Sequence, residues 1–124
     1  MKLSHVCIIT DDLNRLTGFY QRVLLIEPQI FRGEYVEFPT PGATLSLYSL
    51  ASHEQLAPGT MEAALNHSVE LEFAVADVEA EYARLQKERI DWVMAPTTLP
   101  WGHRSIYFRD PDGNLINFYS MISE

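Results

Sequence analysis

The sequence predicts an α+β fold made of two tandem β-α-β-β-β modules, whose strands form a curved mixed sheet around a cleft. Two observations support this prediction. A strand-like run followed by a helix that begins at an aspartate occurs twice along the 124 residues. In addition, two blocks of the first half match two blocks of the second half in the same order. A duplicated unit explains such ordered matches better than chance similarity does.

Each half opens with a strand that leads into a helix. The strands are predicted over residues 3–10 and 69–75. Asp11-Asp12 and Asp77 follow them, and an aspartate at the start of a helix accepts hydrogen bonds from the free N–H groups of the first turn. Apolar residues at helical spacing come next, at Leu13, Leu16, Tyr20 and Val23-Leu24 in the first half and at Val78, Tyr82 and Leu85 in the second.

Each half closes with a turn and a short aromatic strand. Residues 40–49 match residues 111–120 after a shift of 71 positions, whereas the opening strands match after a shift of 65. The second half is therefore six residues longer inside, and we place the extra length around residues 96–102. Asp110-Pro111-Asp112-Gly113 is the stronger of the two turns, with proline second and glycine fourth.

The chain is interpreted as a single domain, residues 1–124, with internal modules 1–50 and 68–124 joined by a linker at 51–67. The linker mixes Pro58-Gly59 with polar residues and a few apolar ones. It is expected to be irregular apart from a short helical turn. The alternative is a functional lid, because long connections are often binding loops.

Composition limits the partners and the location. Nine basic residues against 17 acidic ones give a net charge of −8, whereas nucleic acids and anionic membranes attract basic patches. We therefore expect neither partner, and solubility alone is an alternative reason for the acidic balance. No apolar run approaches the roughly 20 residues of a membrane span, and no apolar secretory segment follows Met1. One cysteine, Cys7, excludes an intrachain disulfide, suits a reducing cytoplasm and is expected to be buried.

Strand alternation assigns the side chains to two faces of each sheet. Val69, Leu71, Phe73 and Val75 share the face that a helix covers, so Glu70 and Glu72 point the other way. If the two uncovered faces curve together they enclose a cleft with a few convergent polar groups, which is typical of a small-molecule site. The side chains expected in this cleft are His5, Ser46, Glu70 and Asn117, with Tyr48 and Tyr119 as aromatic walls.

At these residues the sequence resembles the vicinal oxygen chelate superfamily, which includes glyoxalase I, extradiol dioxygenases and bleomycin-resistance proteins. The matching segments cover nearly the whole chain outside the linker. They are Leu3-Ser4-His5-Val6, Ala76-Asp77-Val78, Trp101-Gly102-His103-Arg104 and Tyr107-Phe108-Arg109-Asp110-Pro111-Asp112-Gly113-Asn114. The resemblance implies the fold predicted above and a homodimer, but it does not assign one reaction, because one fold hosts several chemistries.

The resemblance also locates the positions at which metal-dependent members hold a divalent cation. Here these positions are His5, Ser46, Glu70 and Asn117. His5 fits the pattern and Glu70 still offers a carboxylate, but Asn117 offers only a neutral carbonyl oxygen and Ser46 is a poor ligand. We therefore expect no metal cofactor, and a weakly bound divalent metal on His5 and Glu70 is the alternative.

The favoured function is the binding of a small planar or aromatic molecule through Ser46, Tyr48, Trp101, Arg104, Asn117 and Tyr119. The resemblance implies that Trp101 stacks on the ligand and that Arg104 engages an anionic oxygen. Alternatively, Trp101 covers an edge of the core and Arg104 pairs with an acidic neighbour.

Two other function classes stay open. The first is a lyase or dioxygenase in which His5 and Glu70 are catalytic, either with a divalent metal or as a general acid and base. The second is a structural module with a vestigial cleft. His5 can also be a strand histidine that is hydrogen-bonded to a neighbour. The remaining histidines, His53 and His67 in the linker and His103 in a loop, are expected on the solvated surface.

Overall fold

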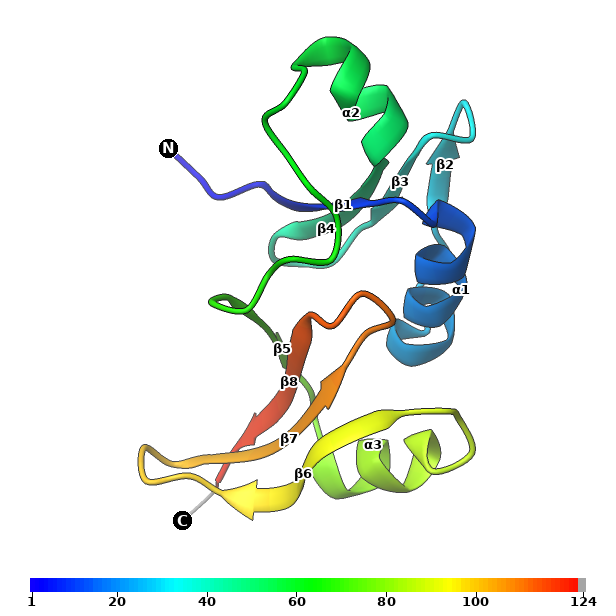
Figure 1. The fold of residues 1–124 in the computed structure, drawn as a ribbon. Helices are drawn as coiled ribbons and strands as arrows, with labels where there is room; N and C mark the ends of the chain where they lie inside the picture. The colour runs from blue at the N-terminus through cyan, green and yellow to red at the C-terminus, as the bar shows by residue number, and fades with distance from the viewer. Residues whose placement is uncertain (123–124) are drawn as a thin grey trace. The chain divides into compact units, whose positions relative to one another are not determined.

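The first half of the chain folds in the order strand, helix and three strands, followed by a short helix. The computed structural model describes residues 1–122. The first unit, Met1–Leu65, contains β1 (His5–Thr10), α1 (Leu13–Leu24), β2 (Gln29–Phe31), β3 (Tyr35–Phe38), β4 (Thr44–Ser49) and α2 (Leu50–Leu56) (Figure 1). Its strands form one sheet in the order β1-β4-β3-β2, in which β1 and β4 are parallel and the other pairs are antiparallel.

The second half repeats this arrangement. The second unit starts at Asn66 and contains β5 (Glu70–Ala74), α3 (Val78–Leu85), β6 (Asp91–Thr98), β7 (His103–Arg109) and β8 (Leu115–Met121). The strand order is β5-β8-β7-β6, and again only the first pair is parallel. The prediction of two tandem β-α-β-β-β modules with mixed sheets is thereby confirmed.

The strand registers of the two sheets correspond. Cys7 lies opposite Ser46 in the first sheet, and Glu72 lies opposite Asn117 in the second. These two pairs are related by the shifts of 65 and 71 positions found in the sequence. β6 has eight residues where β2 has three, so much of the extra length of the second half lies in this strand and the turn after it.

Each unit has its own apolar core between its sheet and its longer helix. In the first unit Leu16 and Tyr20 of α1 and Phe38 and Leu47 of the sheet are fully buried. In the second unit the corresponding side chains are Val78 and Leu85 of α3 with Ile106, Phe108 and Ile116 of the sheet. In each unit the sheet face turned away from this core carries residues predicted for the site, namely His5 and Ser46 in the first unit and Glu70 and Asn117 in the second.

The aspartates predicted to start the helices do so. Asp12 Oδ1 accepts a hydrogen bond from the backbone N–H of Arg15 at 3.2 Å, and Asp77 Oδ1 accepts one from Ala80 at 3.2 Å. These bonds satisfy N–H groups that have no partner within the first turn.

The connection between the modules is more regular than predicted. Part of the expected linker forms α2, whose first turn is capped by Ser49, and α2 contacts β1 and β4. Cys7 is exposed, so the prediction of a buried cysteine is wrong. The reason is that Cys7 lies on edge strand β1, on the sheet face opposite α1. Within residues 1–122, no helix combines the length and the apolar character that crossing a membrane requires.

Candidate functional site

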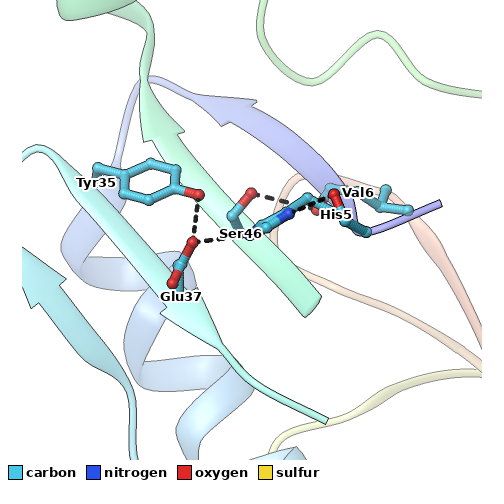
Figure 2. A network of polar contacts seen from close by, with 6 residues as sticks. His5, Val6, Tyr35, Glu37 and Ser46 are labelled. Carbon is cyan, nitrogen blue, oxygen red and sulfur yellow. Dashed lines mark hydrogen bonds and ion pairs between the residues drawn. The ribbon is translucent and has the colours of Figure 1, made fainter. Parts of the chain in front are cut away.

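The polar face of the first sheet carries a connected group of side chains around His5 (Figure 2). His5 Nε2 lies 2.9 Å from Glu37 Oε2, and the hydroxyl of Tyr35 donates to the same oxygen at 2.8 Å. Tyr35 and Glu37 are two positions apart on β3, so their side chains share one face of the sheet. Because only β4 separates β3 from β1, both side chains lie near His5 on that face. We call these residues the His5–Glu37–Tyr35 network.

Both ring nitrogens of His5 are engaged. A carboxylate can only accept, so in the neutral ring we assign the proton to Nε2, which donates to Glu37. Nδ1 then accepts from the Ser4 hydroxyl at 2.9 Å. The His5 side chain is 43% exposed and that of Glu37 is 22% exposed, so the network is open to solvent and to ligands.

Ser46 and Tyr48 share the polar face of β4 with this network. Ser46 is buried, and its hydroxyl faces the carbonyl oxygen of Val6 at 3.5 Å. The Tyr48 ring lies edge-on to Tyr35, with ring centres 5.9 Å apart, and to His53 of α2, with ring centres 6.0 Å apart. His53 is thus half-buried against an aromatic ring, so the prediction of a solvated surface residue is wrong for it.

The second sheet brings Glu70 and Asn117 together, as the strand alignment predicted. Asn117 Nδ2 donates to Glu70 Oε1 at 3.3 Å and to Glu72 Oε1 at 3.1 Å. Asn117 is buried, and its Oδ1 has no hydrogen-bond partner among residues 1–122. Two carboxylates therefore share one amide donor at the surface of the sheet.

Tyr119 and Trp101 belong to an aromatic group centred on His103. The ring of His103 stacks on Tyr119 with centres 4.2 Å apart and planes 12° apart, and Trp101 Nε1 donates to His103 Nδ1 at 3.2 Å. His103 is the first residue of β7, not a solvated loop residue, so that prediction is wrong. Trp101 itself is 63% exposed.

Arg104 lies on the other face of the sheet. Along β7 it lies two and four positions before the buried residues Ile106 and Phe108, so it shares their face, which is turned toward α3. Its Nε donates to Glu79 Oε1 at 2.7 Å, and its Nη1 donates to Thr98 Oγ1 at 3.1 Å. This contact is the pairing with an acidic neighbour that was predicted as the alternative for Arg104. The structure does not bring Arg104 to the polar face, where the ligand-binding role would need it.

The residues at the four family metal positions do not fit a catalytic metal. Both nitrogens of His5 are hydrogen-bonded, Ser46 is a poor ligand, and the Asn117 amide presents its N–H groups to the carboxylates. Across residues 1–122, no three His, Cys, Asp or Glu side chains are grouped so that they could hold one ion. We therefore derive no chemical step through a metal.

Two tyrosines of the polar faces have raised pKa values. Burial raises the pKa of Tyr35, and the Glu37 carboxylate raises it further, whereas a hydrogen bond with Ser46 acts in the opposite direction. Burial likewise raises the pKa of Tyr107, to which the negative charges of Glu70 and Glu72 add. Both phenols are therefore protonated at neutral pH, and that of Tyr35 donates to Glu37.

The free energy of unfolding is expected to fall as the pH rises above about 10. Because the folded-state pKa of Tyr35 and of Tyr107 lies above that of the unfolded chain, the folded chain holds more protons in this range. Their contribution is full below the unfolded pKa and is lost as the pH rises through the folded pKa. Denaturant unfolding at a series of alkaline pH values measures the slope. The variant Tyr35→Phe/Tyr107→Phe should show a shallower slope, and an unchanged slope would contradict the assignment.

Glu37, Tyr35 and Glu72 are polar-face residues that the predicted site did not include. Tyr35-Val36-Glu37-Phe38 alternates polar and apolar side chains, and this alternation is the signal by which β3 could have been assigned its two faces. Glu72 follows Glu70 by two positions and so shares its face.

Comparison with known proteins identifies the family. The family model of the Glyoxalase/Bleomycin resistance protein/Dioxygenase superfamily matches residues 2–118. An uncharacterised protein of Bacillus subtilis (strain 168), YraH, is 26% identical over 98% of this chain and 100% of its own.

Solved structures with the same fold include a glyoxalase/bleomycin resistance protein/dioxygenase from Nocardioides, with a TM-score of 0.82, 22% identity and coverage of 99% of this chain and 85% of that one. Another is a family enzyme from Burkholderia phytofirmans PsJN, with a TM-score of 0.85, 18% identity and coverage of 98% and 100%. At these identities the structures establish the fold alone. Because the family model spans nearly the whole sequence, the chain belongs to the glyoxalase/bleomycin resistance protein/dioxygenase superfamily.

Proposed function

We propose that the chain binds a small planar or aromatic molecule on the polar faces of its sheets and that this binding needs no metal ion. The observation that supports it best is the state of His5. The one imidazole at a family metal position is held at Nε2 by Glu37 and at Nδ1 by Ser4, so neither nitrogen is free for a metal. In this arrangement His5 holds the Glu37 carboxylate in place on the polar face of the first sheet.

The aromatic side chains of the same faces support a planar ligand. In the first unit Tyr48 lies edge-on to Tyr35 of the His5–Glu37–Tyr35 network, and in the second unit Tyr119 stacks on His103. Such rings offer broad apolar contact, and their hydroxyl groups add directional hydrogen bonds. A few polar groups among aromatic walls is the usual composition of a small-molecule site.

Thermal unfolding with a panel of planar aromatic compounds tests this function. A compound that binds only the folded chain is expected to raise Tm with concentration, by an amount equivalent to about 2.7 kcal/mol at 100 times Kd. The increase should be the same in EDTA as in added Zn²⁺, Ni²⁺, Mn²⁺ or Fe²⁺. Tyr35→Phe should weaken it, whereas Tyr82→Phe, on the helix side of the second unit, should not.

The competing function is a divalent-metal lyase or dioxygenase that uses His5 and Glu70. Metal analysis of the purified protein separates the two functions. Stoichiometric metal that survives dialysis and is lost in His5→Ala would overturn the metal-free proposal.

The tautomer of His5 gives a direct test of its role. We expect nitrogen chemical shifts to show the neutral ring protonated at Nε2, because Glu37 accepts there. Glu37→Leu is expected to remove this preference, whereas Glu34→Leu, which loses a bond to Ser52, leaves it. A neutral ring that is protonated at Nδ1 in the unmodified protein would contradict the assignment, because Nε2 would then be free to bind a metal.

We also propose that the chain is a homodimer of the cytoplasm. A single cysteine suits a reducing compartment, and the exposed Ile30 and Phe31 on edge strand β2 offer apolar surface for association. Light scattering after gel filtration is expected to give twice the mass of one chain. The mass of a single chain at all concentrations would contradict the dimer.

A further inference from the structure

The second unit contains a cavity of about 280 Å³ at one end of its polar face. Its lining residues lie in the segment 66–69, at the starts of β5 and β8 and at the end of β7. Only one of its residues, Glu70, belongs to the predicted site. The side chains that matter for its chemistry are those of Asn66, His67, Ser68, Glu70, Arg109 and Leu115.

The wall formed by residues 66–69 is fixed by Asn66. Its Oδ1 accepts from the backbone N–H groups of Ser68 at 3.2 Å and of Val69 at 3.1 Å. Its Nδ2 donates to Asn114 Oδ1 at 3.1 Å. Asn114 is buried. The Asp110 carboxylate accepts hydrogen bonds from the backbone N–H of Asn114 at 2.9 Å and from Asn114 Nδ2 at 2.8 Å. The turn Asp110–Asn114 therefore holds the wall in place.

Arg109 supplies a positive charge that has no carboxylate partner. Its Nη1 donates to the carbonyl oxygen of Gly113 at 2.8 Å, which fixes the guanidinium at the end of β7. Among residues 1–122, no Asp or Glu oxygen lies within 4.0 Å of it, whereas Arg104 on the same strand is paired with Glu79 at 2.7 Å. A guanidinium has five N–H donors, so Arg109 keeps enough of them for a carboxylate to bind with both oxygens.

Glu70 supplies the opposite charge in the same cavity. One of its oxygens accepts from Asn117 at 3.3 Å, and the carboxylate is not paired with Arg109. The ligand that complements both groups carries a carboxylate for Arg109 and a hydroxyl or ammonium donor for Glu70. A cavity of about 280 Å³ suits a molecule below drug size.

We propose that this cavity binds a small hydroxy acid or amino acid, with its carboxylate on Arg109 and its hydroxyl or ammonium group on Glu70. His67 and Ser68 offer further hydrogen bonds at the edge, and Leu115 contacts the carbon atoms of the ligand. The site goes beyond the function proposed above, because its ligand is a polar acid and it does not use the His5–Glu37–Tyr35 network.

Titration of the ¹⁵N-labelled protein with glycolate, glycine, acetate and inorganic phosphate tests this site. We expect the Arg109 Nε–H resonance to shift and saturate with glycolate or glycine, and whichever of the two binds more tightly identifies the donor. Acetate lacks a donor for Glu70 and is expected to bind more weakly. Arg109→Gln should lower the affinity about tenfold or more, because a charge-assisted pair of hydrogen bonds is lost.

Arg104→Gln is the matched control, because Arg104 lies on the same strand and faces away from the cavity. It is expected to leave the affinity unchanged, whereas Glu70→Gln should reduce the preference for glycolate or glycine over acetate. Arg109→Lys keeps the positive charge and should bind more weakly than the unmodified protein, which covers the case in which Arg109→Gln does not fold.

Equal losses in Arg104→Gln and Arg109→Gln, or a shift that does not saturate, would overturn the proposal. Phosphate binding as tight as that of glycolate or glycine would overturn the assignment of Glu70. The aromatic-ligand test above uses different compounds and Tyr35→Phe, so the failure of one proposal leaves the other measurable.

Discussion

Replacing Asp110 with alanine is expected to lower the free energy of unfolding by about 3 kcal/mol. Asp110 is 4% exposed, and its carboxylate accepts from the backbone N–H groups of Asp112 and Asn114 at 2.9 Å each. It also accepts from Asn114 Nδ2 at 2.8 Å. Hydrogen bonds to a charged acceptor contribute about 1.5–3 kcal/mol each, and water replaces part of them in a turn near the surface.

Denaturant unfolding followed by tryptophan fluorescence measures this loss. Asp91→Ala is the control, because Asp91 is exposed at the start of β6, and its effect should stay within about 0.5 kcal/mol. Asp110→Asn keeps one acceptor oxygen and should lose about half as much as the alanine variant. If Asp110→Ala were as mild as Asp91→Ala, the turn would owe its shape to Pro111 and Gly113 alone.

The same substitution should also weaken the binding of glycolate or glycine. Asn114 joins Asp110 to Asn66, so losing Asp110 releases the wall of the cavity at residues 66–69. A variant that lost stability but kept its full affinity would show that the wall is held without this connection.

The fold could be predicted because its signals are local. Asp12 and Asp77 begin helices through bonds to residues three positions later, and the turn at Asp110 carries its own proline and glycine. Local signals do not show which strands play the same part in the two halves. The repeat shows this, because it relates β1 to β5 and β4 to β8. The segment after β4 has no match in the part of the second half that the structure describes, and there α2 is longer than the short helical turn that the sequence predicts.

The site was harder to predict because it depends on strand register. Glu37 reaches His5 only because β3 pairs with β4 so that Glu37 lies opposite Ser46, and no pattern within one strand states its register against another. His103 meets Tyr119 through the register of β7 against β8 in the same way. Arg104 is different, because it is spaced two and four positions from the apolar residues Ile106 and Phe108, and this spacing in the sequence indicates that it shares their helix-covered face.

Phe108→Ala is expected to lower the free energy of unfolding by about 3–5 kcal/mol, the range found for buried phenylalanine. Phe108 is fully buried near the end of β7. Its ring lies edge-on to Phe118, with centres 5.2 Å apart, and to Trp92, with centres 5.5 Å apart. Alanine leaves a space that the strands of the sheet cannot close, so the lost contacts add to the lost burial. Val93→Ala, at a side chain that is 49% exposed on β6, should have a far smaller effect.

Phe38→Ala makes the corresponding change in the first unit, because Phe38 is also fully buried and lies against Tyr20 with ring centres 6.1 Å apart. Each unit has its own core, so we expect each variant to lose amide hydrogen-exchange protection first in the unit that carries the substitution. Protection that falls equally in both units for either variant would contradict this expectation, because it would mean that the two cores unfold as one cooperative structure.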